Sequence, residues 1–217
     1  MKLNLRRPTL VITGLWNPAI FQPAWVAVTL LNVPSGAEIN FVEVIEAPGK
    51  VTHYFGDIGI CVPPGRLELF VNVRADEKWT ELENLALKIL ATLPHTPIQG
   101  FGINFRFEDD NPDPAVVDKL WTHEGLETRF EIVASSMRNR LKFEDCELLL
   151  VREISDGSFS VDFNFHHAEM SLDKLTEILP GAIVNRLNRA TVLMLDVYNI
   201  EIEQPVLAHQ FPATAAE

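Results

Sequence analysis

Two segments of the chain, GRLELFVNV at residues 65–73 and GSFSVDFNF at residues 157–165, follow the same pattern. In each segment a turn glycine precedes a strand in which apolar and polar residues alternate, and the segment ends in apolar–Asn–apolar. The offset between equivalent positions is constant, since residue 157 corresponds to 65 and residue 165 to 73. A repeat of this kind predicts an internally duplicated fold, with Asn72 and Asn164 as paired repeat positions.

The sequence around each segment predicts one unit of strand, strand, strand, helix and strand. The strands follow from two-residue alternation, and the helices from apolar residues at three- and four-residue spacing. For the first unit the predicted strands are 38–46, 51–62, 66–74 and 98–107, with a helix over 79–93. For the second unit they are 126–134, 141–154, 158–165 and 191–198, with a helix over 172–183. This order is typical of the α+β class, with antiparallel or mixed sheets and helices packed on one face.

The two units are expected to form one compact body. Residues 1–107 hold an extra strand, a short helix with Pro23 near its start, and the first unit. An acidic connector spans 108–124, the second unit spans 125–200, and a loosely ordered tail spans 201–217. The tail lacks apolar periodicity, so it has no face with which to pack.

Proline and glycine mark two places where the regular pattern breaks. Pro180–Gly181 falls within the second predicted helix, and because proline removes a backbone hydrogen bond, this helix should kink or split. Gly100 and Gly102 lie in a predicted strand, where the lack of a Cβ indicates a bend or the close approach of another backbone. They do not match a dinucleotide-binding loop, because the third glycine and the following helix are missing.

The formal net charge of −12, from 30 acidic and 18 basic residues, argues against nucleic-acid binding. Affinity for phosphates depends on Lys and Arg, and the basic clusters at 138–142 and 186–189 are small enough to be solvated surface. No apolar window approaches the ~18 residues of a membrane helix. We therefore expect a cytoplasmic protein without nucleic-acid or membrane partners. Cys61 and Cys146 are expected to be buried free thiols.

The most chemically suggestive cluster is His166, His167 and Glu169, which follow an alternating strand directly. Together with Asp109 or Asp110 from the connector, they would make a zinc or iron ligand set and hence a metal-dependent hydrolase. Adjacent histidines on a strand point to opposite faces, however, and the i, i+4 spacing of helical zinc motifs is missing. We therefore interpret the cluster as a solvated strand end and expect neither a bound metal nor another cofactor. The paired asparagines are better explained as strand-end residues that bond the backbone.

An aromatic face is predicted for the sheet, formed by Phe101, Phe105, Phe107, Phe159, Phe163 and Phe165. If the helices cover only one face, some of these rings would need a partner subunit to bury them. The sequence also contains no nucleophile elbow, phosphate-binding loop or kinase signature. The leading hypothesis is therefore a non-enzymatic protein–protein interaction or assembly module that forms a homo-oligomer. The metal-dependent hydrolase is the first alternative, and a small-molecule sensor that binds between the repeats is the second.

Overall fold

The computed structural model describes all residues except 48–49, 114–116, 118–133, 156, 169 and 204–217. Its centre is one ten-stranded antiparallel sheet in the order β3-β4-β5-β6-β2-β7-β10-β9-β8, with β1 paired to β7 outside this path. The strands are β1 (Lys2–Asn4), β2 (Leu10–Gly14), β3 (Val42–Ala47), β4 (Lys50–Phe55), β5 (Ile58–Cys61), β6 (Arg66–Val71), β7 (Ile98–Asp109), β8 (Ala134–Phe143), β9 (Cys146–Ser155) and β10 (Ser158–Ala168).

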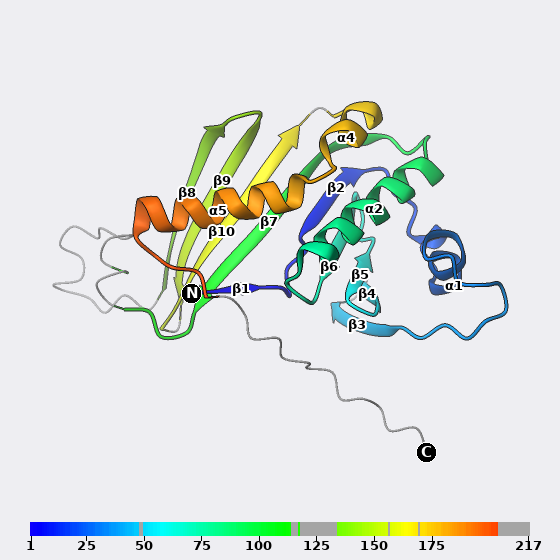
Figure 1. Ribbon diagram of the computed structural model, residues 1–217, viewed down its shortest axis with the longest axis horizontal. Helices are drawn as coiled ribbons and strands as arrows, with labels where there is room; N and C mark the ends of the chain where they lie inside the picture. Colours follow the sequence, from blue (N-terminus) through cyan, green and yellow to red (C-terminus); the bar gives the residue numbers. More distant parts are fainter. Residues whose placement is uncertain (48–49, 114–116, 118–133, 156, 169, 204–217) are drawn as a thin grey trace, which may run out of the picture.

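Figure 1 shows the long helices α2 and α5, together with α4, lying across one face of this sheet. The helices are η1 (Pro18–Ile20), α1 (Pro23–Trp25), η2 (Val26–Leu30), α2 (Asp76–Thr92), α4 (Leu172–Ile178) and α5 (Ala182–Tyr198). Helix α2 contacts β6, α5 contacts β7, and the two helices contact each other. The predicted α+β class is confirmed, and the sheet is antiparallel. Among the described residues, no helix has the length and apolar character needed to cross a bilayer.

The predicted aromatic face lies at the centre of the sheet, on β7 and β10. Phe105 is the register partner of Phe163, and Phe107 packs edge-on against the same ring at 5.8 Å between centroids. All six phenylalanines predicted for this face are at most 3% exposed within the single chain. Each buried ring contributes about 1.5–3 kcal/mol to stability. The expectation that some rings need a partner subunit is therefore wrong, because the chain's own helices cover them.

The end of the chain departs from the predicted second unit, and the internal duplication is not confirmed. Residues 191–198, predicted as the closing strand, lie inside helix α5. Leu187, Ala190 and Met194 are buried at three- and four-residue spacing, so one face of a continuous helix packs against the core. The β-branched residues of this segment favour a strand, but packing of the helical face outweighs that preference.

Two segments predicted as single strands are hairpins. Residues 51–62 form β4 and β5, with a turn at Gly56, which has a positive φ of 62°. Residues 141–154 contain the end of β8 and most of β9, with a turn at Glu144, which has a φ of 47°. A positive φ costs glycine little, so the first turn has a clear sequence signal and the second does not. The predicted strand 126–134 lies outside the described residues except for its last residue.

Helices α4 and α5 are separated at Pro180–Gly181, as the sequence predicts. Gly181 has a φ of 74°, a left-handed conformation that a residue without a Cβ adopts readily. The buried carboxylate of Glu83, from α2, accepts hydrogen bonds of 2.7 Å from the backbone N–H groups of Gly181 and Ile183. A carboxylate at this place also interacts favourably with the helix dipole. Glu83 therefore links α2 to the first turn of α5.

Candidate functional site

One end of the sheet carries potential metal-ligand side chains on the face toward the helices. Phe101 of β7 and His167 of β10 are register partners, and their rings stack with 4.4 Å between centroids and 2° between planes. On the other side of β10, His166 pairs with Glu147 of β9. Because the strands are antiparallel, the residue before Glu147, Cys146, lies beside His167.

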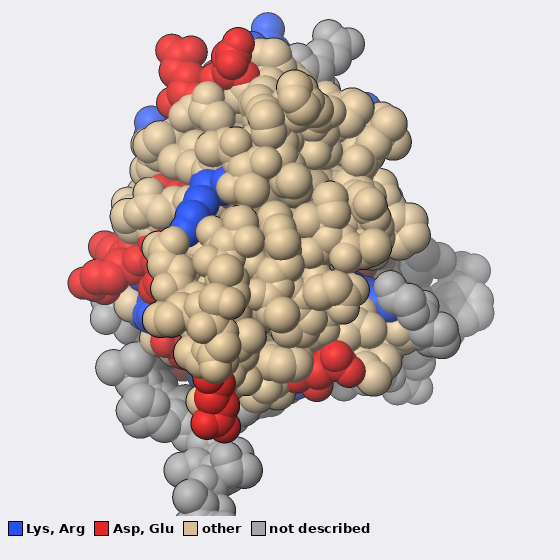
Figure 2. Space-filling view, turned by 90° about the vertical axis from the view of Figure 1, so that its right-hand side faces the viewer, with Lys and Arg blue, Asp and Glu red and all other residues tan. Residues whose placement is uncertain are grey.

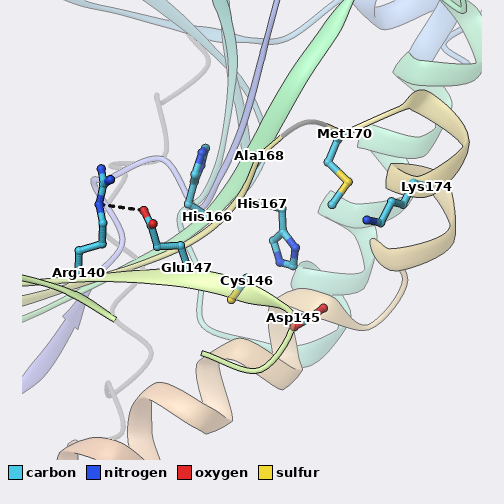
Figure 3. A pocket seen from close by; sticks show the side chains of 9 residues that line it. All are labelled: Arg140, Asp145, Cys146, Glu147, His166, His167, Ala168, Met170 and Lys174. Atoms are coloured by element: carbon cyan, nitrogen blue, oxygen red, sulfur yellow. Dashed lines mark ion pairs between the residues drawn. The ribbon is translucent and has the colours of Figure 1, made fainter. Parts of the chain in front are cut away.

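Asp145, Cys146 and His167 come together at this end of the sheet (Figure 3). One potential ligand atom of each, from the carboxylate, the thiol and the imidazole, lies within 4.8 Å of the others. His167 is only 3% exposed, and its Nδ1 has no hydrogen-bond partner among the described residues. Cys146 is partly buried and Asp145 is exposed. These three groups are all known ligand types for Zn²⁺.

The cluster opens into a pocket of about 440 Å³. Besides the three clustered residues, the pocket is lined by Arg140, Glu147, His166, Ala168, Met170 and Lys174. Figure 3 shows Arg140 paired with Glu147, with 3.0 Å between Nε and Oε1. A second hollow of about 570 Å³ adjoins the pocket along the turn between β8 and β9. The cluster is therefore accessible to small ligands from solvent.

Burial controls the protonation of two members of the cluster. The pKa of Cys146 is raised from 9.0 to about 11, chiefly because burial disfavours the thiolate. The pKa of His167 is lowered, chiefly because burial disfavours the charged imidazolium. Both side chains are therefore neutral near pH 7. A protonated thiol is a poor nucleophile, so the geometry does not indicate an activated catalytic cysteine.

Arg186 of α5 approaches the cluster from the helix layer. It is 6% exposed, and its guanidinium donates hydrogen bonds to Asp145 Oδ1 and, at 2.9 Å, to Glu144 Oε2. The guanidinium carbon also lies 5.6 Å from the ring centroid of Phe165. Burial alone would raise the pKa of Asp145, but the hydrogen bond from Arg186 helps to outweigh that effect, and the pKa is lowered. Asp145 is therefore an ionised carboxylate at neutral pH.

The residues predicted from sequence are only partly brought together. His166 and His167 point away from each other in Figure 3, as strand geometry predicts, although both line the pocket. Asp109 lies at the other end of β7, as the register partner of Phe159, and its Oδ2 is 3.9 Å from the amino group of Met1. Asp110 follows Asp109 in the chain and is exposed. Glu169 lies outside the described residues.

The interpretation of the strand end as solvated is wrong for His167. This residue is buried against Phe101, and only His166 is partly open to solvent. Sequence reasoning assigned Cys146 to the core and did not single out Asp145. The register between β9 and β10 places Asp145 and Cys146 beside His167. The alternation of apolar residues along the two strands does not determine this register by itself.

The paired asparagines lie in different surroundings. Asn164 sits within β10 as the register partner of Asn104, and its Oδ1 is buried without a partner among the described residues. Asn72 follows β6, and its backbone N–H donates to the carbonyl oxygen of Asp57 at 2.9 Å. The two positions therefore do not form one symmetric site.

A second candidate site is a surface. Residues 8–37 contain no Asp, Glu, Lys or Arg, although these residues make up 22% of the chain. The stretch includes β2, η1, α1 and η2, and Figure 2 shows that the side of the molecule with these helices has its charged groups mainly at the rim. We call the exposed part of residues 15–37 the uncharged face. Its apolar members include Leu15, 68% exposed, and Val28, 42% exposed.

Aromatic packing and one lysine attach the uncharged face to the rest of the fold. Phe21 packs edge-on against Trp16 and Trp25, with ring centroids 6.1 and 5.5 Å apart. Lys88 of α2 donates a hydrogen bond of 2.7 Å to the carbonyl oxygen of Leu30, at the end of η2. These contacts fix the short helices, whose outer side chains form the uncharged face, to the rest of the fold.

Comparison with known proteins gives no match: no family model, no curated protein and no solved structure matches the chain. The cluster and the uncharged face are therefore interpreted from their own residues.

Proposed function

We propose that the protein is a protein–protein interaction module whose first partner is a second copy of itself, docked through the uncharged face. The observation that supports the proposal is the run of residues 8–37 without a charged side chain, in a chain whose net charge is −12. Protein interfaces are depleted of charged residues at their centre and surrounded by a polar rim. The uncharged face has this composition, and most of the charged groups on this side of the molecule lie around its edge (Figure 2).

Electrostatics favour this face over the acidic remainder of the surface for self-association. Two copies that each carry −12 repel one another, and the repulsion grows as acidic side chains come close. Docking through the uncharged face keeps most charges at the rim, where water and salt screen them. Burial of exposed apolar side chains such as Leu15 and Val28 then contributes about 25 cal/mol per Å² of apolar surface.

The edge strand β3 is the rival surface. All its residues are exposed, including Val42, Val44 and Ile45 at 49%, 38% and 67%. An edge strand can pair with another chain through its free backbone groups. Glu43 and Glu46 also lie on β3, however, and natural edge strands use charges to prevent such pairing. We therefore assign the first contact to the uncharged face.

Sedimentation velocity of the purified chain tests this proposal. We expect a dimer of the 24.4 kDa chain at micromolar concentration. Raising the salt concentration from about 50 to about 500 mM should preserve or strengthen the dimer, because salt screens the repulsion between acidic copies. Leu15→Glu and Val28→Glu should each weaken the dimer at least ~10-fold, because each places a charge within the interface.

Val192→Glu is the matched control, because Val192 is a 49% exposed valine on α5, away from the uncharged face. This variant should dimerise as the wild type does. A monomer at every accessible concentration would refute self-assembly. Loss of the dimer in Ile45→Glu but not in Val28→Glu would place the interface on β3 and contradict our assignment.

A further inference from the structure

We infer that Asp145, Cys146 and His167 bind a divalent transition-metal ion of the zinc class, with one coordination position open to the pocket. The site goes beyond the proposed interaction function and does not depend on it. Of these three residues, only His167 belongs to the ligand set predicted from sequence. Asp145 lies in the turn before β9, and Cys146 is the first residue of that strand.

The distances are close to those of a metal site. The three potential ligand atoms lie within 4.8 Å of one another. Around a tetrahedral Zn²⁺ with bonds of about 2.0–2.3 Å, ligand atoms lie about 3.3–3.8 Å apart. A movement of about 1 Å would therefore complete the site. Asp145 is the exposed member and lies at the turn between two strands, so it is the residue best able to move.

His167 supplies an independent observation that points to a ligand. The side chain is buried, its Nδ1 has no partner within the described part of the chain, and Figure 3 shows the ring directed toward Cys146 and Asp145. Buried polar atoms in native proteins almost always have a hydrogen-bond partner or a bound ion, so we expect this nitrogen to bind a ligand. Stacking on Phe101 fixes the plane of the ring. A metal ion between the three side chains would satisfy the histidine without rearranging it.

The neighbouring charges leave Asp145 free to coordinate. Its Oδ1 accepts the hydrogen bond from Arg186, and a carboxylate can accept bonds at both oxygens, so Oδ2 can bind a metal at the same time. Outer-shell contacts of this kind orient metal ligands. Arg186 also keeps Glu144 as a partner if Asp145 turns toward the metal. Lys174, which lines the pocket, would attract an anionic ligand toward the open position.

The donor set selects the class of metal. Cys146 is a protonated thiol without metal, so it releases its proton to solvent when it coordinates the ion as a thiolate. A thiolate and an imidazole are ligands for zinc and related transition metals, whereas Mg²⁺ and Ca²⁺ prefer sites made of oxygen alone. Three protein ligands with one open position are typical of catalytic zinc sites, whereas structural zinc sites usually have four protein ligands. The proposed site can therefore both hold an ion and present it to a small molecule in the pocket.

Titration of tag-free, chelator-treated protein with ZnCl₂, followed by calorimetry and by elemental analysis after gel filtration, tests the inference. One equivalent should bind. Cys146→Ser should weaken binding at least ~10-fold, since losing even an outer-shell contact of a metal site typically costs that much. With CoCl₂ as the probe, the wild type should show thiolate-to-metal absorption, and Cys146→Ser should not.

His166→Ala and Cys61→Ser are matched controls. His166 is the neighbouring histidine that points away from the cluster, and Cys61 is the other free cysteine, in β5. Both variants should bind Zn²⁺ as the wild type does. ZnCl₂ should also raise the melting temperature of the wild type and both controls, and that of Cys146→Ser much less, because an ion that binds only the folded state stabilises it in proportion to its affinity.

If Cys146→Ser proves poorly folded without metal, Asp145→Asn, at the exposed turn, replaces it. This variant should likewise bind Zn²⁺ at least ~10-fold more weakly than the wild type. Three outcomes would overturn the inference: no saturable Zn²⁺ binding by the wild type, unchanged binding by a folded Cys146→Ser or Asp145→Asn, and loss of binding by His166→Ala. The last outcome would mean that the ligand set is a different one.

Discussion

The backbone at residue 100 determines where His167 lies. A Cβ on Gly100 would come within 2.5 Å of the carbonyl oxygen of His167, so β7 and β10 reach their observed separation only because residue 100 has no side chain. The register then stacks Phe101 on the imidazole. The sequence predicts a close approach of another backbone at this glycine, and the structure identifies the strand that approaches.

Cys146 should react with iodoacetamide about tenfold more slowly at pH 8 than an exposed cysteine does. Its pKa is raised from 9.0 to about 11, so about 100-fold less thiolate is present, while the more basic thiolate is about tenfold more nucleophilic. The rate should rise about tenfold per pH unit between pH 8 and pH 10. Mass spectrometry of the Cys146 peptide, in the Cys61→Ser background with chelator present, measures this rate.

Denatured protein provides the reference for the alkylation experiment, because unfolding exposes the same thiol to water. In urea, the pH dependence should shift to that of an ordinary cysteine. A reaction rate for the folded protein that levels off below about pH 9 would show that burial does not hold the thiol protonated, and would contradict the environment described for Cys146.

The candidate site could be predicted only in part. His167 is recognisable as a metal-binding residue type, and Cys146 is expected to be a buried free thiol, but nothing in the sequence pairs them. Their proximity depends on the turn at Glu144, which has a positive φ and lacks a glycine signal. Without that turn, residues 141–154 are predicted as one strand, and Asp145 falls inside it rather than beside His167.

At the scale of whole elements, local sequence patterns predict secondary structure correctly where one pattern is strong. They fail where helical and strand periodicities compete in the same segment. Pro180–Gly181 breaks the second helix as predicted, because a proline limits the hydrogen bonding of any helix. Residues 191–198 are rich in β-branched side chains yet complete α5, because Ala190 and Met194 continue the buried helical face. Burial of that face against the sheet is a property of the tertiary structure, which no short window contains.

Glu83→Ala should lower the free energy of unfolding by about 2–4 kcal/mol, because two backbone N–H groups lose a charged acceptor at the start of α5. Glu83→Gln should cost less, since the amide oxygen can still accept one of these bonds while its NH₂ group cannot. Urea unfolding followed by circular dichroism measures both changes.

Glu81→Ala is the control for this prediction, because Glu81 lies on the same helix but is exposed and pairs only with Lys78 among the described residues. The control should change stability by no more than about 0.5 kcal/mol. Equal effects of Glu81→Ala and Glu83→Ala would show that helix propensity in α2, rather than the contact with α5, sets the cost.

At the scale of the molecule, one sheet joins the parts that the sequence assigns to two units. Strand β7 pairs with β2 on one side and β10 on the other, and the same helices cover the central rings. The sequence correctly predicts the class and the apolar strands near the centre of the sheet, at 66–74, 98–107 and 158–165, but it does not reveal how completely the helices bury the phenylalanines. The lack of charge in residues 8–37 is visible in the sequence. That these residues form an exposed surface on one side of the molecule depends on the fold.

The strongest argument for nucleic-acid binding is a short basic row on β8. Arg138, Arg140 and Lys142 are exposed and alternate along the strand, so they share one face. Arg140 is already paired with Glu147 at 3.0 Å, so among the described residues only Arg138 and Lys142 of this row remain for phosphates. Non-specific binding gains its affinity from many such contacts, and each weakens as salt rises. A net charge of −12 opposes even this approach.

We therefore expect no saturable binding of labelled ~20-nucleotide single- or double-stranded DNA up to about 10 µM protein, at about 150 mM salt. Fluorescence anisotropy measures this directly. The double variant Arg138→Glu and Lys142→Glu, which reverses the charge of two residues in the row, should leave the anisotropy unchanged, because the row does not bind DNA. Sub-micromolar affinity at that salt concentration, abolished by the double variant, would contradict the charge argument and make β8 a nucleic-acid interface. In that case the local field of three cations would outweigh the acidic field of the whole chain.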